Sequence, residues 1–186
     1  MRIAVFSDTH GNRKDMREVL VRFAPLDLIV HLGDGVRDGI EVAQEAAIPF
    51  RGVCGNEDYG ADLPVTDLVE VEGRRLLLTH GHHMNINPYL PKEIWQRDLR
   101  EMAAWTKGRG AEALLFGHAH VPVLQREKGV VLCNPGDQYI GATAGASFAI
   151  VEAEAEALLF RIFRKNKSRE WGLLGELRQD HTGTKG

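Results

Sequence analysis

Five short motifs in this sequence carry side chains that bind metal ions. They read SDTHGN (7–12), LGDG (32–35), GNED (55–58), THGHH (79–83) and FGHAH (116–120). Aspartate, asparagine and histidine are ligands of borderline divalent ions, and the motifs contain no cysteine, which argues against a structural zinc site. The motifs therefore favour an open metal site of the kind that catalyses reactions.

The candidate ligands are more numerous than one ion needs. They are Asp8, His10, Asp34, Asn56, His80, His118 and His120. A carboxylate can bridge two ions that lie ~3.5–4 Å apart, so that both polarise one water and one phosphoryl group. We therefore expect two divalent ions, with Asp34 as the candidate bridge. In Asp8-x-His10 and His118-x-His120 the spacing of two places both side chains on the same face of an extended segment.

Each motif follows directly after a predicted strand. Apolar runs predict strands at 2–6, 26–33 and 49–55, and apolar residues at helical spacing predict helices at 12–23 and 38–47. This βαβαβ order favours a parallel sheet with right-handed crossovers. Because the carboxyl ends of neighbouring strands converge on one crevice, we expect the motifs to share one site.

The rest of the chain predicts antiparallel strands and one more long helix. We expect a hairpin at 67–80, a helix at 91–107, a hairpin at 121–136 that turns near Lys128 and Gly129, and two paired strands at 147–163. Nine or ten strands are too many for one flat sheet, so the sequence predicts an α/β fold of two packed mixed β-sheets flanked by helices.

Length and composition indicate one globular domain. The chain has 186 residues, of which 44% are apolar and 26% charged. We expect a single domain over 1–165 and a C-terminal extension at 166–186, whose last six residues fray. The apolar cluster of the extension, Trp171, Leu173, Leu174 and Leu177, is typical of a patch on a sheet edge or a partner.

Charge and cysteine usage limit the partners and the compartment. The net charge of −3 provides no surface for broad binding of nucleic acid or of an anionic membrane. The first segment turns polar after six residues, no apolar run approaches the ~20 residues that cross a bilayer, and two cysteines are too few for a disulfide scaffold. We therefore expect a cytoplasmic protein that acts on a small molecule; a homo-oligomer is compatible with this interpretation.

The ordered set of motifs, D-x-H, GD, GN, THGH and GH-x-H, resembles the calcineurin-like metallophosphoesterase superfamily. The short length resembles its small single-domain, YfcE-like phosphodiesterase branch, and the likeness extends over residues 1–163, including the NPG at 134–136. It implies a four-layer αββα sandwich. It also implies a phosphodiesterase in which a hydroxide that bridges two metal ions attacks phosphorus, with manganese as the expected metal and iron, nickel or zinc as other options.

The resemblance assigns the ligands to two metal positions. One position takes Asp8, His10, Asp34 and His120. The other takes Asn56, His80, His118 and the bridging Asp34. The expected catalytic residues are Asp34, Asn56, His80, His118 and His120.

Two positions depart from the family pattern. Many members read GNHD or GNHE at the third motif, where the histidine contacts phosphate, but this chain has Glu57, which cannot be assumed to donate the proton. Asp137 follows NPG where many members have serine. If its carboxylate points inward, it repels a dianionic monoester more than a monoanionic diester, which favours diesters.

Four further polar residues are candidates for holding the ligands or touching the substrate. They are Asn12, Glu57, Asp58 and His82. For Asn12, capping of the first helix is the simpler role.

Two other functions remain open on the sequence. A phosphomonoesterase would use the same site on a different substrate. A non-catalytic scaffold is the third option, because a eukaryotic retromer subunit shares this fold and serves mainly in protein assembly. Loss of catalysis is expected to remove ligands, and all seven ligand positions are filled here, which favours an enzyme.

Overall fold

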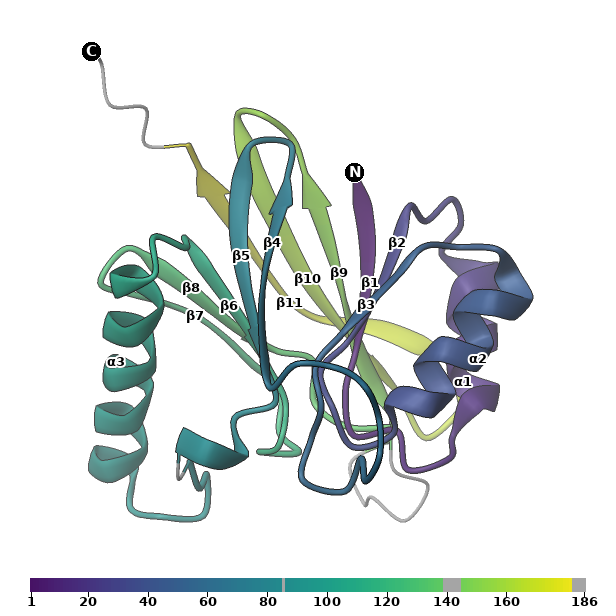
Figure 1. Ribbon diagram of the computed structural model, residues 1–186, viewed down its shortest axis with the longest axis horizontal. Helices are drawn as coiled ribbons and strands as arrows, with labels where there is room; N and C mark the ends of the chain where they lie inside the picture. Colours follow the sequence, from purple (N-terminus) through teal and green to yellow (C-terminus); the bar gives the residue numbers. More distant parts are fainter. Residues whose placement is uncertain (85, 139–144, 182–186) are drawn as a thin grey trace.

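The computed structural model describes residues 1–84, 86–138 and 145–181, and these form four layers (Figure 1). Two β-sheets pack against each other in the middle. Helices α1 and α2 cover the outer face of one sheet, and α3 covers the outer face of the other. The expected α/β sandwich of two mixed sheets between helices is confirmed.

The first sheet has six strands in the order β11-β10-β9-β1-β2-β3. Its parallel part consists of β1 (Arg2–Phe6), β2 (Leu28–His31) and β3 (Phe50–Gly52), joined by α1 (Arg13–Arg22) and α2 (Val36–Ala46). Its antiparallel part consists of β9 (Ser147–Ala153), β10 (Ala157–Lys165) and β11 (Trp171–Asp180). The predicted βαβαβ unit at the start of the chain is therefore present.

The second sheet has five strands in the order β4-β5-β6-β8-β7. Its strands are β4 (Thr66–Val71), β5 (Arg74–Thr79), β6 (Ala113–Phe116), β7 (Val123–Glu127) and β8 (Val130–Asn134). The short 3₁₀ helix η1 (His82–Met84) and the helix α3 (Lys92–Gly108) connect β5 to β6. Both predicted hairpins form, but β5, β6 and β8 run parallel, so this sheet is less antiparallel than the sequence suggests. Glu72-Gly73 and Lys128-Gly129 have positive φ at both positions, as tight hairpin turns require.

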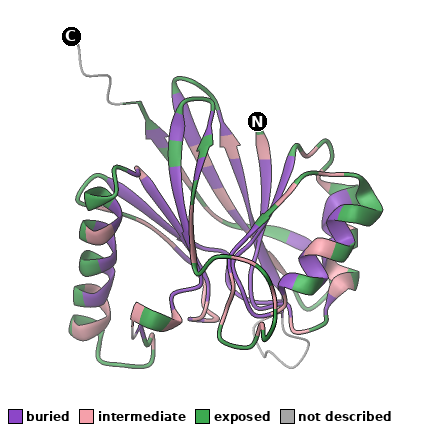
Figure 2. Ribbon diagram, viewed as in Figure 1, coloured by how far each residue is buried: buried purple, intermediate pink, exposed green. Residues whose placement is uncertain are grey.

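The apolar core is divided among three interfaces, which appear as buried strand and helix faces in Figure 2. The first lies between the sheets and includes Val5 and Leu78. The second joins the first sheet to α1 and α2 through residues such as Phe6 and Met16, and the third joins the second sheet to α3 around Leu99. Because all strands share these packed faces, the loops at their carboxyl ends are held in fixed positions.

The C-terminal segment contributes an edge strand to the first sheet. β11 pairs with β10 from Lys165↔Trp171 to Ala157↔Asp180, with an irregularity at Ile162/Phe163. The expected domain boundary at residue 165 therefore lies between two paired strands. The segment expected as an extension forms a strand that is hydrogen-bonded to the edge of the sheet. Leu173 and Leu174 are 56% and 50% exposed on this edge. Of the last six residues, 182–186 lie outside the described residues.

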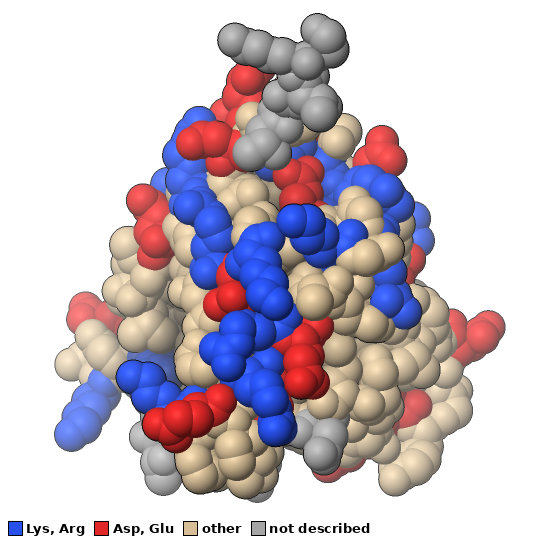
Figure 3. Space-filling model, turned by 90° about the vertical axis from the view of Figure 1, so that its left-hand side faces the viewer, with Lys and Arg blue, Asp and Glu red and all other residues tan. Residues whose placement is uncertain are grey.

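The surface on the α3 side carries a band of Lys and Arg side chains with Asp and Glu beside it (Figure 3). α3 itself contributes both signs, with Arg97 paired to Asp98 and to Glu101. In the part of the chain that is described, α3 and the other helices fall short of the length and apolar character that a membrane span needs. Cys54 and Cys133 are both free thiols, and burial raises the pKa of Cys133 to about 12.

Candidate metal centre

The seven predicted ligands lie on loops that leave the carboxyl ends of strands in both sheets. Asp8 and Asp34 follow β1 and β2 of the first sheet, whereas His80 and His118 follow β5 and β6 of the second. These strand ends meet at the lower edge of the sandwich as drawn in Figure 1. The two packed sheets therefore bring together residues that are more than one hundred positions apart in the chain.

The backbone is in an unfavourable conformation at most of these ligands. Positive φ occurs at nine non-glycine residues of the described chain, and five of them are candidate ligands. These five are Asp8, His10, Asp34, His118 and His120, with φ between 43° and 64°. Such conformations cost of order 1 kcal/mol or more each and persist where the surrounding structure enforces them, which is typical of functional sites.

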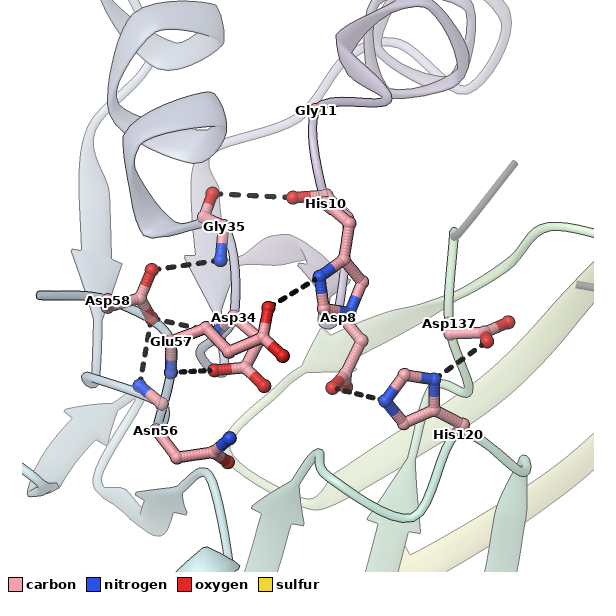
Figure 4. A network of polar contacts seen from close by, with 12 residues as sticks. Asp8, His10, Gly11, Asp34, Gly35, Asn56, Glu57, Asp58, His120 and Asp137 are labelled. Carbon is pink, nitrogen blue, oxygen red and sulfur yellow. Dashed lines mark hydrogen bonds and ion pairs between the residues drawn. The ribbon is translucent and has the colours of Figure 1, made fainter. Parts of the chain in front are cut away.

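Asp8, His10 and His120 form the first group that could hold a metal ion, with one ligand atom from each within 4.8 Å of the others. Asp8 is fully buried and its Oδ1 lies 3.2 Å from His120 Nε2. Ser7 Oγ and the His118 backbone N–H donate to its other oxygen, at 2.5 and 3.1 Å. Both contacts fix the Asp8 carboxylate with Oδ1 directed into the site (Figure 4).

Asp34, His80 and His118 form the second group. His80 Nε2 lies 3.3 Å from Asp34 Oδ2 and 3.2 Å from Asn56 Oδ1. His80 Nδ1 lies 2.8 Å from the carbonyl oxygen of Leu32, so when Nδ1 carries the proton it donates there and leaves Nε2 as the ligand atom. Asn56 therefore lies beside this group, and its role as a ligand of the second metal position stays a prediction.

A third group consists of His10, Asp34 and Glu57. Through His10 it overlaps with the first group, and through Asp34 with the second. Asp34 is 2% exposed and lies between the two sides of the site. Its position is compatible with the bridging role that the sequence predicts.

The residues present fit divalent metal ions. Asp8 Oδ1 is buried and faces another candidate ligand atom, His120 Nε2, at 3.2 Å, so a cation could take the place of the proton between them. The donors are carboxylate, amide and imidazole atoms, the set that borderline divalent ions prefer.

When no cation is bound, protonated histidines compensate the negative charge of the carboxylates. Hydrogen bonds with Asp137 and Asp8 raise the pKa of His120 to about 10. Burial opposes ionisation of Asp34, but the hydrogen bond and charge of His80 outweigh it and lower the pKa of Asp34 to about 2. A bound metal ion must displace such protons from the imidazoles, so metal affinity is expected to rise with pH.

Two carboxylates outside the ligand set hold the ligand loops in place. Asp58 accepts four backbone N–H groups, those of Asp34, Gly35, Val36 and Gly55, at 2.7 to 3.0 Å. It therefore caps the first turn of α2 from another loop, since Gly35 offers no capping side chain. Asp38 accepts from Thr9 Oγ1 and from the Gly11 backbone N–H, at 2.8 and 2.7 Å, and so fastens the Asp-x-His loop.

Asp38 is absent from the sequence-derived candidates. An acidic residue in the first turn of a helix ordinarily serves the helix itself, and nothing near it in the sequence indicates a contact with a loop 27 residues earlier. The tertiary structure alone makes this connection.

Asn12 and His82, the other predicted supporting residues, have different surroundings. Asn12 caps α1 by accepting from the Asp15 N–H at 3.3 Å and donates to the Gln138 carbonyl at 2.8 Å. His82 lies in η1 and lines a cavity of about 340 Å³ together with His118, His120 and Tyr89. The cavity opens beside both candidate metal positions, so His82 is placed to contact a bound substrate.

Asp137 acts on the site differently from the way its sequence position suggests. Its carboxylate is buried and lies 3.0 Å from His120 Nδ1, behind the ring (Figure 4). It is therefore committed to His120 and does not face the substrate. Repulsion of a dianionic monoester by Asp137 would require its carboxylate to point into the substrate site, and it points at His120 instead.

Replacing Asp137 by Asn is expected to weaken metal binding by about 10- to 100-fold, because a carboxylate behind a histidine ligand fixes its orientation and raises its basicity. Titration calorimetry with Mn²⁺ at constant pH measures the change. Asp62→Asn, which alters an exposed carboxylate, is the matched control. Equal affinities in the wild type and the Asp137 variant would show that this contact does not support the metal centre.

The fold is an αββα sandwich of two mixed sheets that carries a candidate metal centre of Asp, Asn and His side chains at its strand ends. The family is clear from the comparison with known domains. The chain belongs to the calcineurin-like phosphoesterase superfamily, whose model matches residues 1–156. Membership of this family supports metal-dependent hydrolysis of a phosphoester.

Related proteins cover most of the chain. A probable metallophosphoesterase of Methanothermobacter thermautotrophicus is 31% identical over 88% of this chain and 92% of its own length. A probable metallophosphoesterase of Bacillus subtilis is 28% identical over 88% and 90%. A phosphodiesterase of Methanocaldococcus jannaschii is 23% identical over 74% of this chain and 84% of its own length.

Solved structures share the fold. A predicted phosphoesterase from Streptococcus pneumoniae superposes with a TM-score of 0.72 at 24% identity and covers 97% of both chains. Vps29 from Entamoeba histolytica superposes with a TM-score of 0.74 at 17% identity, over 98% of this chain and all of that chain.

Proposed function

We propose that this protein is a dinuclear metal-dependent phosphodiesterase. The observation that carries the proposal is the overlap of three ligand groups at one edge of the sandwich, with His10 and Asp34 each shared by two groups. One ion alone would not need both the Asp8 side and the His80 side of this arrangement. Of the expected catalytic set, His80 and His118 share a ligand group with Asp34, Asn56 contacts His80, and His120 belongs to the group of Asp8.

The roles of the side chains follow from their contacts. Asp34 would hold both ions, Asp8, His10 and His120 would complete one position, and His80, His118 and Asn56 the other. When bound, the two ions would activate a water molecule for attack and neutralise charge on the phosphoryl oxygens. The protein supplies the fixed geometry, because Asp8, Asp34 and His80 are each at most 2% exposed and cannot rearrange freely.

The cavity beside the centre is suited to the rest of the substrate. His82, His118 and His120 form its polar part, and the buried Ile86 and the exposed Tyr89 also line it. A volume of about 340 Å³ is within the range of small-molecule sites. A small phosphodiester with an organic substituent in this cavity is the substrate class that we propose, and the relative called a phosphodiesterase supports it.

The direct test is hydrolysis of an activated aryl phosphodiester, bis(p-nitrophenyl) phosphate, by the purified protein with Mn²⁺. We expect turnover that a chelator abolishes and that added Mn²⁺ restores. Parallel assays with Fe²⁺, Ni²⁺ and Zn²⁺ identify the metals that support the reaction, since the donor set accepts several. The absence of turnover with every one of these ions would refute the proposal.

Two alternatives are distinguished by simple measurements. Comparison of rates on p-nitrophenyl phosphate and on the diester separates a phosphomonoesterase from a phosphodiesterase. The shared fold with Vps29 leaves a non-catalytic role in protein assembly as a candidate. Elemental analysis combined with the diester assay discriminates it, because near two equivalents of metal together with turnover favour the enzyme, whereas the lack of turnover in a metal-loaded protein favours the scaffold.

A further inference from the structure

Glu57 follows Asn56 in the third motif, and its surroundings are those of a metal ligand. Its backbone N–H donates to Asp34 Oδ1 at 2.8 Å, and its carboxylate Oε2 lies 3.2 Å from His10 Nδ1. With His10 and Asp34 it forms a group whose ligand atoms all lie within 4.8 Å of one another. Figure 4 shows the Glu57 side chain between Asp34 and His10, directed into the site.

An ion pair between Glu57 and His10 explains this arrangement only in part. The Glu57 side chain is 58% exposed, and ion pairs of exposed groups contribute about 0–1 kcal/mol. The contact also brings the Glu57 carboxylate close to that of Asp34, and the two carboxylates repel each other unless a proton or a cation compensates their charge. A divalent ion next to His10 and Asp34 would remove this repulsion.

We propose that Glu57 is an additional carboxylate ligand of the metal centre on the side of His10 and Asp34. The inference rests on the proposed metal-dependent function and assigns Glu57 to the centre itself, where the sequence suggests only a supporting or substrate-contacting residue. A third oxygen donor of full charge favours hard ions such as Mn²⁺ over softer ones.

The same ligand selects the charge of the substrate. With two divalent ions and the attacking hydroxide in place, Asp8 and Asp34 leave one positive charge uncompensated among the coordinating groups. Glu57 cancels this excess, which disfavours a dianionic monoester more than a monoanionic diester. The preference for diesters thus follows from Glu57 and not from Asp137, which is committed to His120.

The test compares the wild type with Glu57→Gln, which keeps the shape and removes the charge. Titration calorimetry and Mn²⁺ electron paramagnetic resonance measure metal affinity without substrate. We expect one of two Mn²⁺ equivalents to bind about 10- to 100-fold more weakly in this variant, a range typical of altered metal-site contacts. We also expect the ratio of kcat/KM for bis(p-nitrophenyl) phosphate to that for p-nitrophenyl phosphate to fall by about tenfold, because one repulsive charge is lost.

Two further variants complete the design. Asp62→Asn removes an exposed carboxylate from the same loop and should change neither quantity. Glu57→His also removes the carboxylate charge and should shift the diester-to-monoester ratio in the same direction as glutamine does. Thermal unfolding of each variant confirms that it is folded.

The outcomes separate this inference from the proposed function. Unchanged Mn²⁺ affinity in a folded Glu57→Gln protein, with an active wild type, would overturn the role of Glu57 alone. Weakened Mn²⁺ binding in the variant, with a wild type that hydrolyses no phosphoester, would keep Glu57 as a ligand and refute the phosphodiesterase. A wild type that binds no Mn²⁺ would overturn both.

Discussion

Replacing Asp34 by Asn is expected to reduce diester hydrolysis by about 10³-fold or more, equivalent to about 4 kcal/mol of transition-state stabilisation. Asp34, like His10, is shared by two ligand groups, and its Oδ2 faces His80 while its Oδ1 accepts the Glu57 N–H. Asparagine keeps the shape but removes the charge that would hold both ions. The affinity for both Mn²⁺ equivalents should therefore fall together.

His120→Ala is the control for the Asp34 experiment. His120 belongs to the first ligand group only, so its loss should weaken one of the two Mn²⁺ equivalents more than the other. Steady-state kinetics and metal titration on both variants give the comparison. An Asp34→Asn protein that binds two ions tightly and hydrolyses the diester at a near-normal rate would contradict the bridging assignment and the dinuclear mechanism.

Replacing Asp58 by Ala is expected to lower both the stability and the activity of the protein. Four backbone N–H groups lose their acceptor, including the two at the start of α2 and that of Asp34. Hydrogen bonds to a charged acceptor are worth ~1.5–3 kcal/mol each and are not additive, so a loss of about 3 kcal/mol or more in the free energy of unfolding is expected. For a domain of this size the melting temperature should fall by roughly 6–12 °C.

The pH dependence provides a second readout for Asp58. Burial opposes its ionisation, but the four backbone N–H groups outweigh burial and lower the pKa of Asp58 below its ordinary value. The contribution of Asp58 to stability is therefore complete at neutral pH and is lost as the pH falls below about 4, through the lowered folded-state pKa. The stability difference between the wild type and the variant should shrink only in that acidic range.

Asp62→Ala is the matched control for Asp58, because it removes an exposed carboxylate from the same loop. Its free energy of unfolding should stay within about 0.5 kcal/mol of the wild type, as is usual for surface substitutions. If Asp58→Ala were as stable as this control at neutral pH, the four backbone contacts would not carry the expected free energy.

Local sequence patterns determine much of the fold of this protein. The βαβαβ opening and both hairpins follow from apolar periodicity and from turn residues such as Lys128-Gly129, because these signals lie within one element and its neighbours. β11 lacks such a signal. Only Trp171 and Gln179 are buried among its ten residues, so no alternation marks it as a strand, and its pairing with β10 is decided by the open edge of the sheet.

The sequence also indicates which residues form the candidate site, because their motifs follow strands whose carboxyl ends converge. What the sequence could not determine is how each side chain is directed, because that depends on contacts between segments far apart in the chain. Asp137 is directed at His120, and Asp38 holds the loop of Asp8 and His10, through contacts that span 17 and 27 residues. The packing of the two sheets fixes these loops relative to one another, and this long-range geometry turns five separate motifs into one candidate metal centre.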